Sequence, residues 1–218
     1  MKSFMRAQWE MDKVEVKICG ITNHEDALAA AELGAGALGF IFARSQRQIT
    51  PEKARDIITE IPLFVKTVGV FVDEGHAKIK EIIRYCGLDL IQLHGDESPE
   101  LCYEMMPHTI KAIRIKDESS LRSSSAYHGK IRALLLDTFS RNKAGGTGKT
   151  FDWKLAKKIK GQGIPIILSG GLGPSNIDRA IRIVKPYAVD VNSGVEERPG
   201  KKSYVLMRDL MEKVRKFK

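Results

Sequence analysis

Short apolar runs alternate with longer amphipathic segments from about residue 14 to the end of the chain. The apolar runs predict eight strands, over residues 14–19, 37–42, 66–71, 89–94, 110–115, 132–137, 165–168 and 188–191. Most of them are continuously apolar rather than alternating, which is typical of parallel strands buried on both faces.

A helical pattern follows each predicted strand. We expect helices over residues 23–34, from 50 onward, over 75–85 and 98–106, in the serine-rich stretch up to 127, and over 152–160, 174–184 and 201–216. Asn23, Thr50 and Ser98 are suited to cap helix N-termini, and Pro51 suits a first helical position. The sequence therefore consists of repeated strand–helix units.

Eight such units predict a single-domain (β/α)8 barrel, a TIM barrel with a parallel eight-stranded core, over residues 14–218. Residues 1–13 would be an N-terminal extension. The structural alternative is an open doubly wound sheet. That fold would favour a G-x-G-x-x-G turn after a strand, and the sequence has none.

Composition favours an ordinary globular protein of 218 residues, 43% of them hydrophobic and 29% charged. No stretch approaches the roughly 18 consecutive apolar residues of a membrane span, and the N-terminus does not resemble a signal peptide. Cys19, Cys86 and Cys102 have no disulfide-like or metal-like spacing, which indicates reduced thiols and a cytoplasmic location.

The formal net charge of +9 is compatible with nucleic acid, with a small anionic substrate, or with an ordinary basic surface. Only 7% of the residues are aromatic, and no basic block is interleaved with aromatic residues. Nucleic-acid binding is therefore disfavoured.

Polar residues stand where the predicted strands end, which is the face where barrels of this class carry their active sites. These residues are Cys19, the loop 44–47, Asp73, His94, Arg114, Asp137, and the segments 169–171 and 190–194. We expect a site on this rim.

Two small, glycine-bearing turns follow the last two predicted strands. They are Ser169-Gly170-Gly171-Leu172 and Asn192-Ser193-Gly194-Val195. Backbone N–H groups in such turns can approach an anion closely, and barrels of this class often hold a phosphate there. The alternative is that the glycines only allow tight turns.

A long polar loop over residues 137–151 separates the sixth strand from its helix. Its length and glycines predict a lid over bound substrate, and a flexible solvent loop is the alternative. Its Gly145-Gly146-Thr147-Gly148-Lys149 segment lacks the spacing of a phosphate-binding P-loop.

Asp137 and Cys19 are the candidates for acid–base chemistry. Asp137 follows three leucines, and an apolar environment favours the neutral acid form of a carboxyl group, which suits a general acid. Cys19 would be the complementary base, because a thiol near helix N-termini can have a lowered pKa; the sequence leaves the pKa of Cys19 itself open. The first and sixth strands lie on opposite sides of a ring of eight, so the two groups would approach a small sugar from two sides.

Other candidates have an equally plain structural interpretation. His94 would line the pocket or satisfy local hydrogen bonds, and Arg47 would bind a substrate carboxylate or stay in solvent. Asp190 would bind substrate or form a structural ion pair. Cys86 and Cys102 lie on helical patterns and suit the core. No spacing suggests a metal site or a serine–histidine–acid triad.

Taken together, the motifs resemble the phosphoribosylanthranilate isomerase family. They are Lys17-Ile18-Cys19-Gly20-Ile21-Thr22, Gln92-Leu93-His94-Gly95, Leu135-Leu136-Asp137-Thr138, Gly145-Gly146-Thr147-Gly148 with Phe151-Asp152-Trp153, Ser169-Gly170-Gly171-Leu172, and Asp190-Val191-Asn192-Ser193-Gly194-Val195-Glu196. They occur in the family's order and extend from residue 14 to about residue 210.

The resemblance implies an Amadori rearrangement of N-(5-phosphoribosyl)anthranilate in tryptophan biosynthesis. It implies that Asp137 is the acid, that Cys19 is the base, and that Arg47 binds the anthranilate carboxylate. Asp190 would lie near the substrate amine. His94 and Gly146 would also contact substrate, and the phosphate would occupy the turns at Gly170, Gly171, Ser193 and Gly194.

The same resemblance implies a small phosphorylated substrate and neither a metal nor an organic cofactor. We expect a monomer or homodimer without a nucleic-acid or membrane partner. One departure concerns the loop after the second strand, where the family's Ser-Pro-Arg is Ser45-Gln46-Arg47, which puts the placement of the arginine in doubt.

Two kinds of rival function remain. Another phosphosugar barrel is one. The histidine-pathway isomerase would have an aspartate in place of Cys19, and an indole-forming synthase would have catalytic lysines at strand ends. A non-catalytic barrel that binds a phosphosugar or nucleic acid is the other, and it would need neither Cys19 nor Asp137.

Overall fold

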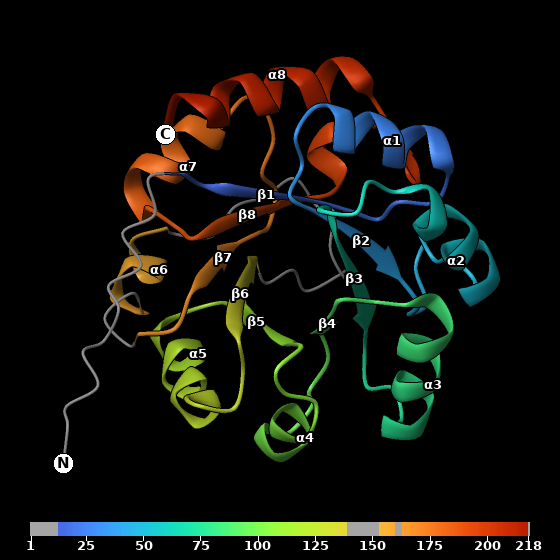
Figure 1. Cartoon of the computed structure of the whole chain (residues 1–218). Coiled ribbons are helices and arrows are strands. Elements are labelled where there is room, and N and C mark those ends of the chain that lie inside the picture. The colour runs from blue at the N-terminus through green and yellow to red at the C-terminus, as the bar shows by residue number, and fades with distance from the viewer. Residues whose placement is uncertain (1–12, 139–152, 160–162, 218) are drawn as a thin grey trace, which may run out of the picture.

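Eight parallel strands close into a barrel with a ring of helices around it, in a computed structural model that describes residues 13–138, 153–159 and 163–217 (Figure 1). The strands are β1 (Glu15–Cys19), β2 (Ala37–Ile41), β3 (Lys66–Phe71), β4 (Leu90–Leu93), β5 (Thr109–Ile115), β6 (Ala133–Thr138), β7 (Ile166–Leu168) and β8 (Ala188–Val191). They are neighbours in chain order, and β8 pairs with β1 to close the ring, with Lys17 opposite Asp190. The predicted (β/α)8 barrel is confirmed.

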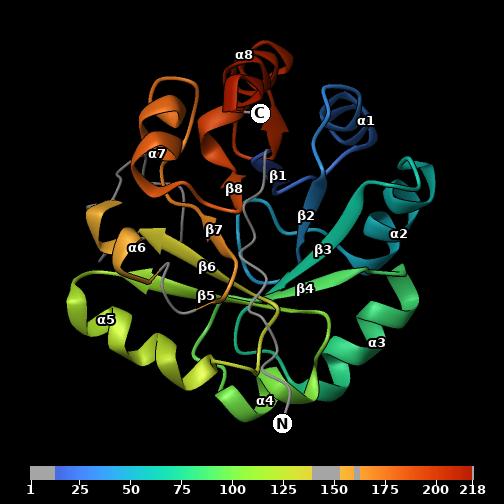
Figure 2. The same cartoon turned by 60° about the vertical axis from the view of Figure 1, so that its left-hand side comes forward.

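The helices surround the strands in the same order, as Figure 2 shows. They are α1 (His24–Glu32), α2 (Pro51–Glu60), α3 (His76–Cys86), α4 (Pro99–Glu104), α5 (Glu118–Arg122), α6 (Trp153–Ile159), α7 (Ile177–Val184) and α8 (Tyr204–Val214). The serine-rich stretch forms α5 and the 3₁₀ helix η1 (Ser123–Tyr127). The N-terminal extension through residue 12, the predicted lid loop from residue 139 onward, and Gly146 within it lie outside the described residues.

Helices α1, α2 and α4 start at the capping residues expected from the sequence. The side chain of Asn23 accepts a hydrogen bond from the Asp26 N–H, that of Thr50 from the Lys53 N–H, and that of Ser98 from the Leu101 N–H. Each cap satisfies an N–H group that has no partner within its helix.

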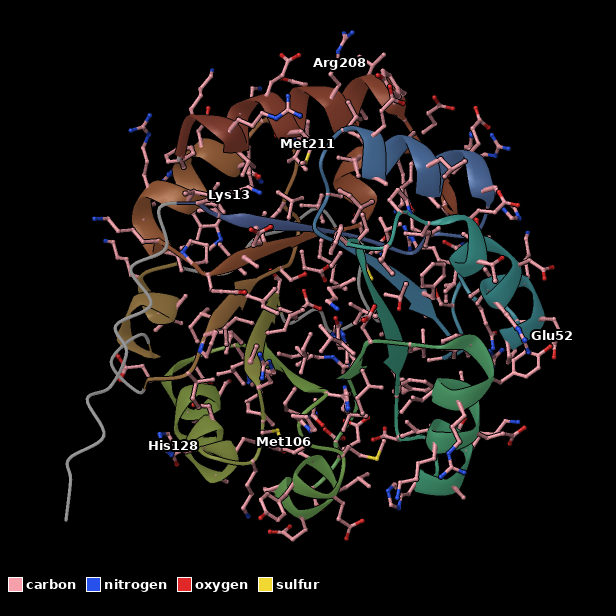
Figure 3. The ribbon with its side chains drawn as sticks, in the orientation of Figure 1. Lys13, Glu52, Met106, His128, Arg208 and Met211 are labelled. Atoms are coloured by element: carbon pink, nitrogen blue, oxygen red, sulfur yellow. The ribbon has the colours of Figure 1, made fainter. Side chains whose placement is uncertain are left out.

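The core has two layers, because successive side chains of each strand point to opposite faces. The larger layer packs between strands and helices, and α8 shows how a helix contributes to it. Met211 points inward and is buried, whereas Arg208 on the same helix points into solvent (Figure 3). The smaller layer fills the barrel interior with Val68, Ile110, Ala112, Ala133, Leu135, Ile167 and Ala188.

The expected start of the last helix at residue 201 is wrong. Residues 201 and 202 form β10 (Lys201–Lys202), which pairs antiparallel with β9 (Glu196–Arg198), and α8 begins at Tyr204. The backbone N–H of Lys202 and the ammonium group of Lys201 both bind the Asp26 carboxylate, at 2.7 and 2.9 Å. These contacts hold the segment extended.

Helix α7 also begins later than predicted, at Ile177. Asn176 bonds back to the preceding turn, because its side chain accepts from the Gly173 N–H and donates to the Gly171 carbonyl. No helix in the described part of the chain has the length and apolar character needed to cross a membrane.

Candidate active site

A pocket opens at the C-terminal ends of the strands, on the face that the sequence analysis singled out. Its lining includes Cys19, Arg44, Arg47, Gln92, His94, Arg114, Asp137, Ser169, Gly170, Gly171, Asp190, Asn192 and Ser193. Of the strand-end candidates, Gln46, Asp73, Val191 and Gly194 are outside this lining. The Asp73 carboxylate instead accepts a hydrogen bond from the Asp96 N–H.

Cys19 is the last residue of β1 and lies beside Gly39 of β2. A Cβ atom at Gly39 would lie 2.7 Å from the Cys19 sulfur and 3.1 Å from Cε of Lys17. The glycine therefore makes the space that lets the thiol and the lysine stand side by side inside the barrel.

The pKa of Cys19, which the sequence left open, is raised rather than lowered. Burial raises the pKa of the thiol, and the nearby Asp190 carboxylate adds to the increase. The ammonium groups of Lys17 and Lys202 oppose this shift without cancelling it. Removal from water disfavours the thiolate more strongly than these two charges favour it, so the resting group is a thiol.

Lys17 is buried with its counter-ion on the opposing strand. Its Nζ atom donates to Oδ1 of Asp190 at 2.8 Å and to Oε1 of Gln92 at 2.9 Å. Burial acts to lower the pKa of Lys17, but the Asp190 charge and the hydrogen bond to it act to raise it, as would a Cys19 thiolate, and the net shift is upward. Asp190 thus forms the structural ion pair that the sequence left open, and it also lines the pocket.

Asp137 reaches the pocket from β6, which β7 and β8 separate from β1, so the two strands are not directly opposite. Its side chain is almost fully buried. Oδ1 accepts from the Thr138 N–H at 2.8 Å, and Oδ2 lies 3.2 Å from Nε2 of His94. Nδ1 of His94 contacts Nε2 of Gln92 at 2.8 Å. His94 therefore both lines the pocket and satisfies local hydrogen bonds.

Arg47 lies in the pocket but is bound to a carboxylate of the protein. Its Nε and Nη2 atoms donate to Glu196 at 2.9 and 2.7 Å, which leaves Nη1 outside this pairing. The Glu196 carboxylate also accepts from the buried Nζ of Lys202 at 2.9 Å. Burial acts to raise the pKa of Glu196, but the bonds and charges of Arg47 and Lys202 lower it by more. Burial lowers the pKa of Lys202, and Glu196 only partly reverses that shift.

The two glycine turns lie next to each other at the rim. Gly170 and Gly171 have φ angles of 89° and 65°, a region that disfavours side chains. A Cβ at Gly194 would collide with the Leu172 carbonyl oxygen, and one at Gly170 would collide with Thr138. The glycines are therefore required for tight turns, and Gly170 and Gly171 also line the pocket.

Sequence reasoning gave no role to four residues of this site, namely Gln92, Glu196, Lys202 and Gly39. Gln92 had a usable signal, because it precedes His94 by two positions and therefore shares its face of the strand. Glu196 and Gly39 meet Arg47 and Cys19 from other strand–helix units, and Lys202 joins the site by binding Glu196, so the strand-end pattern marks none of the three. Among the described residues, no cluster of three or more His, Cys, Asp or Glu side chains could hold a metal ion.

Known proteins match both the sequence and this geometry. The family model described as N-(5'-phosphoribosyl)anthranilate isomerase matches residues 16–213. The isomerase of that name from Moorella thermoacetica is 50% identical over 93% of this chain and 90% of its own.

Two solved structures agree with this match. The phosphoribosyl anthranilate isomerase of Thermotoga maritima superposes with a TM-score of 0.88 at 44% identity, over 93% of this chain and 99% of its own. A phosphoribosyl anthranilate isomerase in complex with reduced 1-(o-carboxyphenylamino)-1-deoxyribulose 5-phosphate gives 0.84 at 42% identity, with the same coverage of both chains. The chain belongs to the N-(5'-phosphoribosyl)anthranilate isomerase family.

Proposed function

We propose that the chain catalyses the reaction for which its family is named. It converts N-(5-phosphoribosyl)anthranilate into 1-(2-carboxyphenylamino)-1-deoxyribulose 5-phosphate, an Amadori rearrangement in tryptophan biosynthesis. The observation that carries this assignment is that Cys19 and Asp137 line one pocket together with the two glycine turns and Arg47.

The two anionic groups of the substrate would bind different groups of the pocket lining. The phosphate would bind the backbone of Gly170, Gly171, Ser193 and Gly194, where small residues let N–H groups approach it. The anthranilate carboxylate would bind the edge of Arg47 that Glu196 leaves open, since a guanidinium can hold a carboxylate on each edge. The family resemblance implies that Gly146 would also contact substrate.

The reaction then needs one acid and one base. Asp137 donates a proton to the ring oxygen as the C1–O bond breaks, which leaves an iminium ion between C1 and the amine nitrogen. The Cys19 thiolate removes the C2 proton, and the electron pair of that bond moves toward the nitrogen to give an enolamine. Protonation at C1 and loss of the C2 hydroxyl proton give the ketone. Lys17 and Lys202 favour the thiolate that the base step requires.

Turnover of the fluorescent anthranilate substrate tests this function directly. The unmodified protein is expected to consume it, and Cys19→Ala and Asp137→Ala are each expected to lower kcat by roughly 10²- to 10⁴-fold. Circular dichroism checks that the variants keep their fold. No consumption by the unmodified protein would contradict the function, and near-normal rates in either variant would contradict the assigned roles.

We further infer a cytoplasmic homodimer. A variant study describes the isomerase of Thermotoga maritima as dimeric. In this chain Leu63 and Phe64, between α2 and β3, are 87% and 91% exposed, and two adjacent large apolar side chains in solvent favour a contact. Sedimentation is expected to give a dimer for the unmodified chain and a monomer for Phe64→Glu. A monomer in both cases would contradict the inference.

A further inference from the structure

A continuous line of hydrogen bonds runs across the pocket from Lys17 to Asp137. Lys17 Nζ contacts Gln92 Oε1 at 2.9 Å, Gln92 Nε2 contacts His94 Nδ1 at 2.8 Å, and His94 Nε2 contacts Asp137 Oδ2 at 3.2 Å. The line connects the lysine beside the candidate base with the candidate acid. Gln92 itself has no role in the reaction as described above.

The chemistry of Lys17 fixes the direction of every bond in this line. An ammonium group only donates, so the Gln92 atom that faces it must be the amide oxygen. The amide nitrogen then faces His94 and donates to Nδ1, which must carry no proton. In an uncharged imidazole the proton is consequently on Nε2, where it points at the Asp137 carboxyl group.

The surroundings of Gln92 prevent the opposite arrangement. The side chain is 1% exposed, and its strand is paired with Val70 of β3 and Ile110 of β5. A rotation of the amide would place its NH₂ group against the Lys17 ammonium and its oxygen against the Nδ1 lone pair. Both contacts would be repulsive, and so little of the residue is exposed that bulk water would hardly weaken the repulsion.

We propose that Gln92 is a positioning residue that holds His94 as an uncharged Nε2–H donor to Asp137. This proposal rests on the proposed function, in which Asp137 releases and regains a proton. A neutral donor supports the carboxyl group through both steps. An imidazolium at the same place would bind the carboxylate as an ion pair and hold it ionised, so that it could not act as an acid.

Other charged groups surround His94 without competing for Nδ1. Arg114 on β5 donates to the His94 backbone carbonyl, and Asp137 on β6 faces Nε2. Lys17 and Asp190 lie beyond Gln92, paired with each other. Gln92 is thus the group in contact with Nδ1, and the substitution of this one side chain tests the proposal.

The tautomer is measurable by ¹⁵N NMR of the histidine rings at mildly alkaline pH, where imidazole is uncharged in water. His94 is expected to show the Nε2–H form. His108 is an internal control, because its Nδ1 lies 2.8 Å from the Asp89 carbonyl oxygen and must carry a proton there. A His94 ring with its proton on Nδ1 would overturn the proposal.

Gln92→Glu keeps the shape of the side chain and replaces the amide donor with a carboxylate acceptor. It is expected to move a proton onto Nδ1 of His94 and to lower kcat at least about tenfold with a smaller change in KM, since a histidine in the wrong tautomer costs several orders of magnitude in other enzymes. Gln92→Met, which offers no polar partner, is expected to give a mixture of tautomers and an intermediate kcat.

The matched control is Gln48→Glu, which makes the same change at an exposed position and is expected to leave both readouts unchanged. A Gln92→Glu protein that retains the Nε2–H form and normal kcat would contradict the proposal. The NMR result needs no turnover. If the protein shows the Nε2–H form of His94 but never consumes the substrate, the proposed function is refuted. The catalytic purpose of Gln92 is then refuted too, whereas its effect on the His94 tautomer is confirmed.

Discussion

At the scale of single residues, burial and the neighbouring charges act in opposite directions on the pKa of the Cys19 thiol. The side chain is 4% exposed, which raises its pKa, while Lys17 and Lys202 lower it and Asp190 raises it again. The thiolate is therefore a minor form at neutral pH in the unliganded protein. Removal of the Lys17 or Lys202 charge is expected to lower the fraction of thiolate, and removal of the Asp190 charge is expected to increase it.

Alkylation of Cys19 by iodoacetamide reports the thiolate, because the thiol itself is unreactive. Since the pKa is raised, the alkylation rate is expected to be low at neutral pH. It is expected to keep increasing at pH values where an ordinary cysteine is already fully ionised. Asp190→Asn removes a charge that raises this pKa, so alkylation at a given pH is expected to accelerate. Mass spectrometry resolves Cys19 from the buried Cys86 and Cys102.

Asp209→Asn is the control for that experiment, because Asp209 lies on α8 with a half-exposed side chain. It is expected to leave the alkylation of Cys19 unchanged. Slower alkylation in Asp190→Asn would contradict the charge balance described here.

Glu196 holds Arg47 in place where the family's proline is absent. Glu196→Gln keeps one acceptor and removes the charge that fixes the guanidinium, so the substrate carboxylate is expected to bind less well. We predict a KM increase of roughly tenfold, equivalent to about 1.4 kcal/mol, with a smaller change in kcat. Glu197→Gln, at the exposed neighbouring position, serves as control, and equal KM values in the two variants would refute this role.

At the scale of elements, the two-residue period of the strands determines which side chains point into the barrel. Lys17 and Cys19 share the inner face of β1, Gln92 and then His94 follow that of β4, and Asp137 lies above Leu135 on β6. Apolar side chains fill the interior below this polar layer. The barrel therefore presents its ionisable groups at one end without exposing them to bulk water.

Close packing of β1 against β2 leads to a prediction for Gly39. Gly39→Ala adds a methyl group 2.7 Å from the Cys19 sulfur, so the thiol must move. Because a base is effective only within hydrogen-bond reach of the proton that it removes, kcat is expected to decrease at least about tenfold. Gly75→Ala is the matched control, since no atom lies within 4 Å of its added Cβ. Equal activity of the two variants would show that the sulfur position tolerates displacement.

The barrel could be predicted from the sequence because the patterns that indicate its strands and helices involve residues that are close together in the chain. Each strand is an apolar run, and helix starts such as Thr50-Pro51 carry their own capping chemistry. The β9–β10 hairpin was missed because Asp26, which holds it, is about 175 residues away in sequence. The shift of the Cys19 pKa could not be predicted from the sequence, since its largest cause is burial within the assembled barrel.

At the scale of the whole molecule, that hairpin joins the last strand–helix unit to the first. Lys202 donates its backbone N–H to Asp26 of α1, and the Thr22 hydroxyl donates to the Gly200 carbonyl at 2.6 Å. Farther along, Arg215 donates to the Leu33 carbonyl at 2.8 Å. The closing of the ring is thus fixed by side chains outside the β1–β8 pairing.

Loss of the Asp26 carboxylate is expected to weaken this closure. Asp26→Ala leaves the buried Lys202 N–H without an acceptor, which should lower the free energy of unfolding by about 2 kcal/mol. Glu25→Ala removes only an exposed partner of Lys201 and should change it by less than about 0.5 kcal/mol. Urea denaturation measures both values, and equal values would contradict a specific role for Asp26.

The groups that support Arg47 and Cys19 come from a much later part of the chain than Arg47 and Cys19 themselves. Arg47 and Cys19 are translated before Glu196, which holds the arginine, and before Lys202, which favours the thiolate. A nascent chain that has formed its first seven strand–helix units still lacks both. Such a chain is therefore expected to contain Cys19 and Arg47 without the carboxylate that orients the guanidinium and without one of the two ammonium groups that favour the thiolate.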